Sequence, residues 1–489
     1  MIRFLLNKRE VALQSFAADT TVLDYLRNAE GKCGTKEGCA SGDCGACTVV
    51  VASPAEVGLH YQSINSCITF LGALHGKQLI TVEDLAEGDQ LHPVQQAMVD
   101  NHGSQCGFCT PGFVMSMFAL YKNVASNADN AHKHHATHEF LAGNLCRCTG
   151  YRPIVDAALK SVEQVQPDQF DKDKENTKKQ LLEIMERNAS PDSSGTSAFK
   201  IPHTLSELSS MYTENPGARL LGGGTDLALE VTQQLKQQDT IILLQNVDEM
   251  HEVEQIDNTL EIGAAVSLSE CDKLLRRRYP AISELLKRFG SSQVRNQGTI
   301  GGNIANASPI GDLPPVLISL NARLRLQQGQ YIREVPVQEF FIDYRKTLLK
   351  PGEFLSTVIL PLPTSDQIFR VYKVSKRLDD DISAVCMAIN VSLNNADETG
   401  TKITSARIAL GGMAAIPKRA FGCESILIGA DLNDKIIDKA GAALGQDFSP
   451  ISDARASADY RIQVAQNLLR RFKFEVTENG IETRVEHVA

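Results

Sequence analysis

Three cysteines in a glycine-rich stretch form the first pattern with recognisable chemistry. Cys39, Cys44 and Cys47 have the spacing C-x4-C-x2-C, and Cys67 follows after an apolar run and a loop. This spacing is typical of plant-type [2Fe–2S] sites, in which four thiolates hold two irons. Disulfides are disfavoured because nothing marks the chain as secreted. Zinc is the serious alternative, although zinc sites usually combine two close cysteine pairs.

A second set of cysteines consists of two close pairs, C-x2-C and C-x-C. Its members are Cys106, Cys109, Cys146 and Cys148. Pro111 follows the first pair and an apolar pattern over 151–159 follows the second, so we expect each pair at the start of a helix. Taken alone, this set is compatible with a four-cysteine zinc site. Beside a ferredoxin-like loop, it favours a second [2Fe–2S] cluster.

Two glycine-rich stretches stand out in the second half of the chain. They are LLGGGTDL at 220–227 and GTIGGNIANASPIGD at 298–312. Neither has the spacing G-x-G-x-x-G or G-x4-G-K-[ST], so Rossmann and P-loop sites are not indicated. Each stretch is by itself more simply a structural turn. Both offer clustered backbone N–H groups, which suit a pyrophosphate, and together they suggest a dinucleotide held by two loops.

Composition restricts the class of protein. The 489 residues are 43% hydrophobic and 22% charged, which is ordinary globular material in about three or four domains. A net charge of −10 does not suggest a nucleic-acid surface. No apolar run approaches a membrane span, and the N-terminal residues do not resemble a signal peptide. We therefore expect a cytoplasmic protein with reduced cysteines.

Several polar or scattered residues have simpler explanations than chemistry. The histidines at 132, 134, 135 and 138 lie in a polar stretch, and we expect an exposed loop or helix start there. Cys271, Cys386 and Cys423 lie far from the other nine cysteines and are expected to be small buried hydrophobes.

The elements around the first cysteines predict a small ferredoxin-like β-grasp domain. Residues 2–6 and 10–16 read as two strands joined by a turn at 7–9. Thr21 and Asp24 form a capping box for a short helix to about residue 28. The helical patterns of the second cysteine set follow. Residues 163–198 are polar, which predicts a linker with one or two helical turns near 179–187.

The remaining elements are mixed. Capping boxes at 204–207 and 267–270 open helices, and strand patterns occupy 241–244, 260–263, 385–391 and 406–410. A long helix is predicted over about 453–473, with an apolar stripe of Tyr460, Val464, Leu468 and Phe472. The fold class is therefore multidomain α+β.

These motifs together resemble the iron–sulfur and FAD-binding small subunits of bacterial xanthine dehydrogenases, in the molybdenum hydroxylase family. The similarity runs nearly from end to end. It is carried by motifs at 38–49, 105–112, 144–152, 223–226, 301–304, 344–349, 379–382 and 457–461. The cysteine motifs are specific for the family, and the Tyr344 motif, with the fused iron–sulfur–FAD order, points to xanthine dehydrogenase within it.

The resemblance implies four domains and a linker. They are a β-grasp [2Fe–2S] domain (1–85), a helical-bundle [2Fe–2S] domain (86–165), a linker (166–197), a vanillyl-alcohol-oxidase-type FAD domain (198–370) and an α+β C-terminal flavoprotein domain (371–489). It also implies two [2Fe–2S] clusters and FAD on this chain, with NAD+ as acceptor. The molybdopterin cofactor would lie on a partner subunit only.

The resemblance further assigns site residues. Cys39, Cys44, Cys47 and Cys67 would hold one cluster, and Cys106, Cys109, Cys146 and Cys148 the other, while Cys33 would be no ligand. FAD contacts are implied for Leu220, Leu221, Gly222, Gly223, Gly224, Thr225, Asp226, Leu227, Phe289, Thr299, Gly302, Asn303, Asn306, Asp312, Leu355 and Lys373. Tyr344 and Asp380 match positions on the NAD side of the flavin. Core packing is the simpler role for Phe289, and solvent exposure for Lys373.

The implied function is electron transfer. Electrons from hypoxanthine or xanthine hydroxylation at a partner molybdenum centre would cross the helical-domain cluster and then the ferredoxin-like cluster, reach FAD, and pass to NAD+. A separate molybdenum-binding large subunit is expected, in a heterotetramer of two small and two large subunits. The alternatives are the same role in an aldehyde or N-heterocycle hydroxylase, or a stand-alone iron–sulfur electron-transfer protein. No nucleic-acid or membrane partner is expected.

Overall fold

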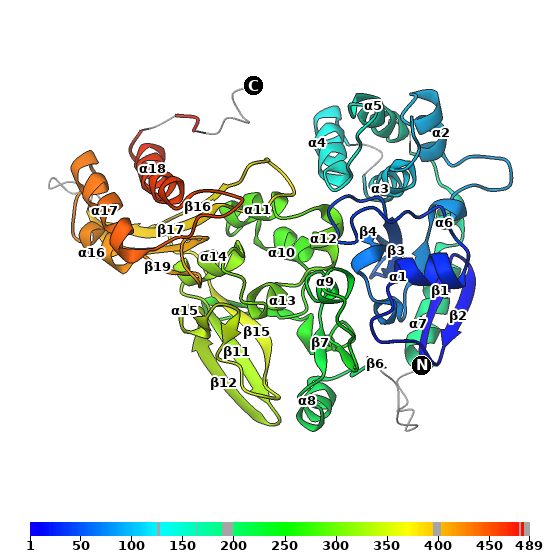
Figure 1. Cartoon of the computed structure of the whole chain (residues 1–489), viewed down its shortest axis with the longest axis horizontal. Helices are drawn as coiled ribbons and strands as arrows, with labels where there is room; N and C mark the ends of the chain where they lie inside the picture. Colours follow the sequence, from blue (N-terminus) through cyan, green and yellow to red (C-terminus); the bar gives the residue numbers. More distant parts are fainter. Residues whose placement is uncertain (125–127, 164, 188–198, 395–401, 479–480, 484–489) are drawn as a thin grey trace. The chain divides into compact units, whose positions relative to one another are not determined.

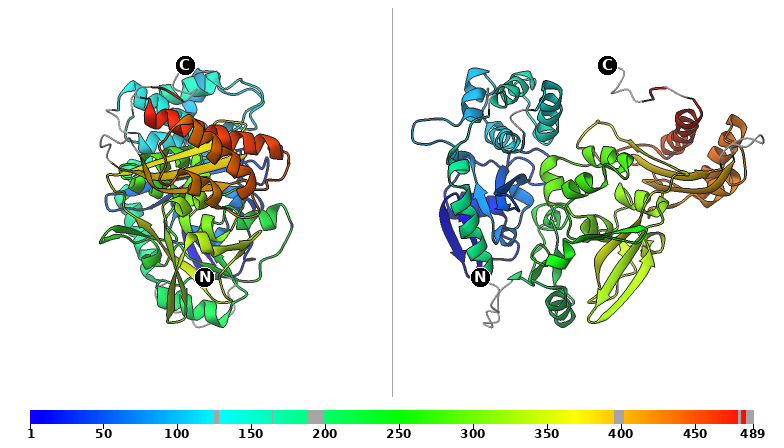
Figure 2. Two further views of the ribbon diagram at one scale, coloured as in Figure 1. Left: turned by 90° about the vertical axis from the view of Figure 1, so that its left-hand side faces the viewer. Right: turned by 180° about the vertical axis from the view of Figure 1, so that it is seen from behind.

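The computed structural model describes residues 1–124, 128–163, 165–187, 199–394, 402–478 and 481–483. The chain forms two compact units (Figures 1 and 2). The first unit comprises Met1–Asp248 and the short segment Gly290–Gly298, and the second comprises Glu249–Phe289 and Thr299–Ala489. The multidomain α+β class predicted from the sequence is confirmed.

The first unit begins with a five-stranded sheet in the order β2-β1-β5-β3-β4. Its strands are β1 (Ile2–Leu6), β2 (Arg9–Leu13), β3 (Thr48–Pro54), β4 (Leu59–Asn65) and β5 (Gln78–Ile80). The turn expected at 7–9 is present, with Asn7 at a φ of 53°. Helix α1 (Val22–Asp24) starts as predicted, because the Thr21 side chain accepts a hydrogen bond from the Asp24 N–H. It continues as a wider turn over Tyr25–Ala29.

Four helices form the second part of this unit. They are α2 (Pro93–Asp100), α3 (Thr110–Asn123), α4 (Asn130–Leu141) and α5 (Arg152–Ser161). Pro111 stands in the first turn of α3, as expected. Every residue of α3 from Gly112 to Tyr121 is buried. A helix that is apolar all round belongs in a core, and α3 contacts α2, α4, α5 and strand β3.

The segment predicted as a linker has the helical turns expected near 179–187, but its helices are longer and pack on the first unit. It contains α6 (Gln169–Lys172) and the longer α7 (Lys174–Arg187), which lies along the first sheet (Figure 1). Leu181 and Ile184 of α7 are fully buried and pack with Leu5 of β1. The three-residue apolar spacing is hidden among lysines and glutamates, which explains why composition suggested a linker. Residues 188–197 lie outside the described part.

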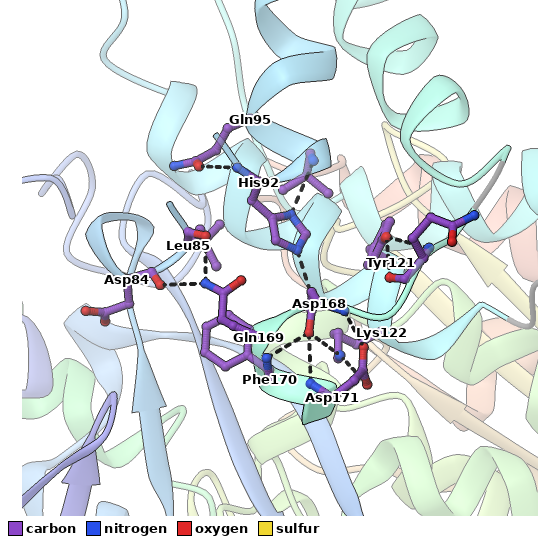
Figure 3. Close-up of polar contacts among 12 residues, drawn as sticks. Asp84, Leu85, His92, Gln95, Tyr121, Lys122, Asp168, Gln169, Phe170 and Asp171 are labelled. Atoms are coloured by element: carbon purple, nitrogen blue, oxygen red, sulfur yellow. Dashed lines mark hydrogen bonds and ion pairs between the residues drawn. The ribbon is translucent and has the colours of Figure 1, made fainter. Parts of the chain in front are cut away.

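A buried polar network fixes the start of α6 (Figure 3). The Asp168 carboxylate accepts hydrogen bonds from the N–H groups of Phe170 and Asp171, both at 2.9 Å. His92 accepts from a backbone N–H through Nδ1, so its Nε2 carries the proton and donates to Asp168 at 3.1 Å. Burial raises the pKa of Asp168, but His92 and Lys122 outweigh it and hold that pKa below its usual range.

The first unit ends with a small parallel sheet in the order β6-β8-β7. Its elements are β6 (Phe199–Lys200), α8 (Leu205–Glu214), β7 (Arg219–Leu221), α9 (Leu227–Thr232) and β8 (Ile241–Leu243). Thr204 caps α8 by accepting a hydrogen bond from the Glu207 N–H, as its sequence predicted. The segment Gly290–Gly298 carries α12 (Ser292–Gln297), whose first turn is capped by Ser291.

The second unit contains an antiparallel sheet in the order β12-β11-β15-β10-β9. Its strands are β9 (Val253–Ile256), β10 (Thr259–Gly263), β11 (Arg323–Gln328), β12 (Tyr331–Pro336) and β15 (Phe354–Pro361). The other elements of this part are α10 (Leu268–Leu275), α11 (Pro280–Lys287), α13 (Ile300–Ala305), α14 (Leu313–Ser319), α15 (Val337–Phe340), β13 (Phe341–Asp343) and β14 (Lys346–Thr347). The capping box predicted for α10 is formed by Ser267 and Glu270.

The C-terminal part of the second unit has its own sheet, β16-β17-β18-β19, covered by helices. Its elements are β16 (Gln367–Val374), β17 (Val385–Leu393), β18 (Ile403–Gly411), β19 (Lys418–Arg419), α16 (Phe421–Leu427), α17 (Asp434–Asp447) and α18 (Ala458–Thr477). Leu468 and Phe472 of α18 are buried as predicted.

The apolar stripe predicted for α18 is wrong at Tyr460, which is exposed. The neighbouring Arg461 is buried instead, because its guanidinium donates to the carbonyls of Ala384 and Gly412 and to Asp453. The sequence pattern placed arginine on the surface because it is charged. Arg461 can be buried because these three acceptors satisfy its guanidinium. None of the helices in the described ranges is long and apolar enough to cross a membrane.

Candidate functional site

The structure brings the first four cysteines together at one end of the β-grasp sheet. Cys39, Cys44 and Cys47 lie on the loop before β3, and Cys67 lies on the short turn Ser66–Ile68 after β4. The Sγ atoms of Cys47 and Cys67 are 3.2 Å apart. Cys39 Sγ accepts backbone hydrogen bonds from Ser41 and Cys44, each at 3.4 Å. Such N–H···S contacts orient and stabilise thiolate ligands.

Glycines are required where this loop wraps around the sulfurs. Gly42 and Gly45 have φ values of 83° and 67°, which side chains rarely tolerate. At Gly38, where φ is not positive, a Cβ atom would lie 2.7 Å from Cys44 Sγ. A side chain at any of these positions would therefore displace a cysteine or strain the loop.

The sulfurs of this first set meet in pairs. A hydrogen bond between Cys39 and Cys44 lowers the pKa of Cys39 and raises that of Cys44. A hydrogen bond from Cys67 likewise lowers the pKa of Cys47. A [2Fe–2S] cluster needs two thiolates on each iron. Cys39 also shares a hydrogen bond with Cys67, which links the two pairs, so all four thiols lie together as that requirement demands.

The second set is paired in the same way. A hydrogen bond to Cys106 raises the pKa of Cys148. Burial, together with a hydrogen bond to Cys146, raises the pKa of Cys109 to about 12. Among the described residues, no three or more His, Cys, Asp or Glu side chains are grouped around a single metal ion. Two sulfur pairs in each set are the grouping that a two-iron centre can use.

Tyr151 and Thr149 support Cys146 in a way that spacing did not reveal. The Tyr151 hydroxyl accepts a hydrogen bond from the Cys146 N–H at 3.1 Å. Tyr151 has a φ of 70°, an unusual value for a tyrosine, and its own N–H donates to Thr149 Oγ1 at 3.1 Å. Thr149 Oγ1 also lies 3.2 Å from Cys146 Sγ. The loop after the second pair is therefore shaped around one sulfur.

The remaining cysteines and the histidine cluster behave as the sequence suggested. Cys271, Cys386 and Cys423 are buried, and all twelve cysteines are free of disulfides. The histidines at 132, 134, 135 and 138 are exposed on α4.

The first glycine-rich loop lies against the turn that carries Cys67. Residues 220–227 run from the end of β7 into α9, and Leu221 packs in one apolar cluster with Cys67 and Ile68. A Cβ atom on Gly223 would lie 1.8 Å from the Gln297 carbonyl oxygen, so the two backbones are in direct contact. Only glycine fits at this position, and the loop adjoins the first cysteine set.

In the second unit, the predicted flavin residues gather around α13. The Thr299 hydroxyl accepts a hydrogen bond from the Gly302 N–H at 3.0 Å and caps this helix. Asn306 follows the last residue of the helix. Asn303 Oδ1 is buried and finds no hydrogen-bond partner among the described residues. A buried acceptor of this kind usually has a partner, and a bound dinucleotide would supply one.

Asp312 and Lys373 contact each other, which the sequence did not predict. Lys373 Nζ lies 2.6 Å from Asp312 Oδ2 and 2.9 Å from Ser383 Oγ, and Ser383 donates to Asp312 Oδ1 at 2.6 Å. The simpler expectation that Lys373 is exposed to solvent is therefore wrong, because its side chain is buried. Leu355 is buried in β15, and Phe289 is half-buried after α11.

Tyr344 and Asp380 both lie in turns of the second unit. Tyr344 is 58% exposed in the turn between β13 and β14. Asp380 follows β16 in a turn with a φ of 48°, and its carbonyl accepts a hydrogen bond from Arg377 at 2.8 Å. Their place beside a nicotinamide stays a prediction.

Sequence reasoning missed a buried polar cluster between the two cysteine sets. Gln293, Thr48, Ser116 and Asn144 are joined by hydrogen bonds and are almost fully buried. Asn144 stands two residues before Cys146, and this position beside a cysteine motif was the one sequence feature that could have pointed to the cluster. Gln293 carries no motif and is separated from Thr48 by 245 positions.

Four family models match consecutive parts of the chain. They are described as "2Fe-2S iron-sulfur cluster binding domain" (5–72), "[2Fe-2S] binding domain" (81–159), "FAD binding domain in molybdopterin dehydrogenase" (195–363) and "CO dehydrogenase flavoprotein C-terminal domain" (370–476). This order supports the prediction of two [2Fe–2S] clusters and one FAD.

Curated relatives resemble nearly the whole chain. Xanthine dehydrogenase of Emericella nidulans is 34% identical over 99% of this chain and 39% of its own length. Xanthine dehydrogenase 1 of Arabidopsis thaliana is 32% identical over 94% of this chain and 38% of its own length. Xanthine dehydrogenase/oxidase of Gallus gallus is 30% identical over 91% of this chain and 38% of its own length. The chain thus spans about two fifths of the length of these relatives.

Two solved structures share the fold of a large part of the chain. A chain of the Cu,Mo-CO dehydrogenase aligns with a TM-score of 0.52 and 25% identity, over 56% of this chain and 94% of that one. A chain of quinoline 2-oxidoreductase from Pseudomonas putida 86 aligns with a TM-score of 0.52 and 25% identity, over 57% of this chain and 95% of that one. The four domain matches and these relatives show that the chain has the two iron–sulfur domains, the FAD-binding domain and the flavoprotein C-terminal domain of the molybdenum hydroxylase family.

Proposed function

We propose that this chain is the electron-transfer subunit of a xanthine dehydrogenase. In this role it carries electrons from hypoxanthine or xanthine oxidation at a partner's molybdenum centre to FAD and then to NAD+, in the cytoplasm. The partner would be a molybdenum-binding large subunit, in a heterotetramer of two small and two large subunits. The support for purine as substrate is the name shared by the curated relatives.

One observation carries the electron-transfer role. Within the first unit, the loop with Cys67 packs against the glycine-rich loop 220–227. At another cysteine of the same set, the N–H of Leu145, the residue before Cys146, donates to the Cys44 carbonyl at 3.0 Å. The ferredoxin-like set therefore adjoins both the second set and a proposed flavin loop. This arrangement supports the order helical-domain centre, ferredoxin-like centre, flavin.

The proposed ligands follow from the sulfur pairs and the loops. We assign one cluster to Cys39, Cys44, Cys47 and Cys67 and the other to Cys106, Cys109, Cys146 and Cys148. Within the first unit, residues 220–227 would contact FAD through their backbone. Within the second unit, the proposed contacts are Phe289, Thr299, Gly302, Asn303, Asn306, Asp312, Leu355 and Lys373. FAD supplies the step between one-electron and two-electron chemistry. Of these residues, Asn303 has the clearest support, because its buried Oδ1 has no hydrogen-bond partner in the part of the chain that the structure describes.

A second candidate function is the same role in a hydroxylase of N-heterocycles or aldehydes. The fold shared with quinoline 2-oxidoreductase favours the heterocycle version. The residues that choose the substrate would lie on the partner, so both versions predict the same chemistry on this chain.

Co-purification with turnover assays separates these functions. The tagged chain is isolated from its native cells and assayed with xanthine, an aldehyde and quinoline, using NAD+ as acceptor. We expect a large molybdenum-containing partner in equal amount and turnover of xanthine. Turnover of quinoline or the aldehyde without turnover of xanthine would support the second candidate function instead. Iron–sulfur chain recovered without a molybdenum partner would support a stand-alone electron carrier.

A further inference from the structure

The segment Gly290–Gly298 belongs in sequence to the matched flavin-binding domain but packs in the first unit. Its Gln293 is fully buried. The Nε2 group of Gln293 lies 3.1 Å from Ser116 Oγ, 3.1 Å from Asn144 Oδ1 and 3.3 Å from Thr48 Oγ1. Thr48 opens β3 of the β-grasp domain, whereas Ser116 and Asn144 belong to the helical domain. One side chain therefore touches both iron–sulfur domains.

The partners of Gln293 also bond to one another. Ser116 donates to Asn144 Oδ1 at 2.6 Å, and Asn144 Nδ2 donates to the Gly45 carbonyl at 3.0 Å. Thr48 Oγ1 donates to the same carbonyl at 2.7 Å. A buried network with complementary donors and acceptors holds its members in one geometry, and an unpaired member is costly.

This network lies where the two cysteine sets meet. Gly45 stands between the proposed ligands Cys44 and Cys47, and Asn144 stands two residues before Cys146. Between them, the Leu145 N–H donates to the Cys44 carbonyl at 3.0 Å. The backbone of one proposed ligand is thus hydrogen-bonded to the residue that precedes another. A shift in the network would lengthen this connection.

The packing around the network is tight. A Cβ atom on Gly45 would lie 2.2 Å from the Gly143 carbonyl, and one on Gly112 would lie 2.2 Å from the Gly45 carbonyl. A Cβ atom on Gly143 would lie 2.3 Å from Ser291 Cβ, in the Gln293 segment. The backbones at Gly45, Gly112 and Gly143 therefore approach one another closely because none of them carries a side chain. The Gln293 segment packs against Gly143 through Ser291.

The segment is attached on both sides of Gln293. Arg295 Nη2 lies 3.1 Å from Glu139 on α4, with only 5% of the arginine side chain exposed. Asn296 Nδ2 donates to the Ser63 carbonyl on β4 at 3.0 Å. These contacts join the segment to the helical domain and to the β-grasp domain separately. Gln293 contacts both domains at the cysteine loops and reinforces the direct bond from Asn144 to the Gly45 carbonyl.

We propose that Gln293 is a positioning residue that holds the Cys44 and Cys146 loops at a fixed separation and thereby sets the rate of electron transfer between the two clusters. The proposal rests on the proposed cluster ligands. Each transfer moves one electron, so one centre is oxidised and the other reduced by one, and no bond is made or broken. Gln293 Nε2 bonds to Asn144, Ser116 and Thr48, and it would act on the clusters through these residues.

The test uses the full chain with Gln293→Met, which keeps the length of the side chain and removes its hydrogen bonds. The matched control is Asn123→Ala. Asn123 also joins the two domains, by donating to the Tyr61 carbonyl at 2.9 Å, but it bonds to no cysteine loop. Three quantities are measured: iron content, the magnetic interaction between the two reduced clusters by EPR, and hydrogen exchange of the Leu145 amide.

We expect Gln293→Met to retain iron at the wild-type level and to weaken the magnetic interaction. Exchange of the Leu145 amide should be faster by about tenfold or more, because its hydrogen bond loses the support of a buried network. In the complex with the partner, reduction of flavin by substrate should slow by about tenfold, as expected when a transfer geometry loosens. Asn123→Ala should match the wild type in all of these.

Unchanged magnetic interaction and unchanged Leu145 exchange in Gln293→Met would overturn the proposal. If Gln293→Met loses a cluster, Ser116→Ala decides, because it removes one acceptor and leaves the others. In Ser116→Ala, a weaker magnetic interaction and a smaller increase in Leu145 amide exchange would support the proposal. Wild-type values of both quantities would refute it. If the wild-type chain does not show two [2Fe–2S] signals, the proposed cluster ligands are wrong. If the wild-type chain shows both signals and Gln293→Met behaves like it, only the role of Gln293 is refuted.

Discussion

Replacement of Lys373 should destabilise the second unit strongly. Lys373 and Asp312 are 3% and 4% exposed, and their charged atoms are 2.6 Å apart. Lys373→Met would leave the buried Asp312 carboxylate with Ser383 as its one remaining hydrogen-bond donor among the described side chains. Breaking a buried ion pair by removing one partner typically costs about 3–5 kcal/mol. For a part of this size, such a loss lowers the midpoint of thermal unfolding by about 10 °C.

The assay is differential scanning calorimetry on wild type, Lys373→Met and the double variant Asp312→Leu with Lys373→Met. FAD content is measured in parallel, because bound ligand also stabilises the folded state. The double variant should recover most of the lost stability, since no unpaired charge remains. A single variant within about 1 kcal/mol of the wild type would refute the reasoning. A double variant as unstable as the single one would show that packing at this site, rather than charge, is lost.

Three further predictions follow from the same structure. Cys67→Ala should remove only the ferredoxin-like cluster, so iron falls by about half and one EPR signal persists; loss of both signals would contradict separate sites. Asp380→Ala should lower turnover with NAD+ and leave turnover with an artificial acceptor close to wild type, whereas equal losses would indicate a folding role. Burial lowers the pKa of His75 to about 4, below the value of about 6.5 in the unfolded chain. The unfolded chain therefore takes up the proton first as pH falls, stability drops between about pH 6.5 and 4, and His75→Asn should reduce that drop in urea unfolding. An unchanged pH slope in His75→Asn would exclude this histidine as the cause.

The cysteine loops could be predicted because their chemistry is local. The spacing of Cys39, Cys44 and Cys47, with glycines between them, requires a tight loop whatever surrounds it. Capping residues such as Thr21 and Ser267 act within one turn, so the sequence also indicated where those helices begin. Local rules were enough for these elements.

The parts that the sequence did not reveal depend on distant contacts. Half of the residues of α7 are charged, so the sequence predicted only one or two helical turns there, and its full length depends on Leu181 and Ile184 packing on the β-grasp sheet. Lys373 is buried because Asp312, 61 positions earlier in the chain, supplies the opposite charge. Gln293 has no motif, and its importance arises from partners in two other domains. Propensity and spacing do not encode such pairings.

The central claim is that this chain carries two [2Fe–2S] clusters and a flavin for electron transfer. Iron, acid-labile sulfide, zinc and FAD are measured on the purified chain, together with EPR after reduction. The account predicts about four irons and about four sulfides per chain, one FAD and two distinct [2Fe–2S] signals. About two irons with zinc at the second cysteine set and a single EPR signal would contradict it.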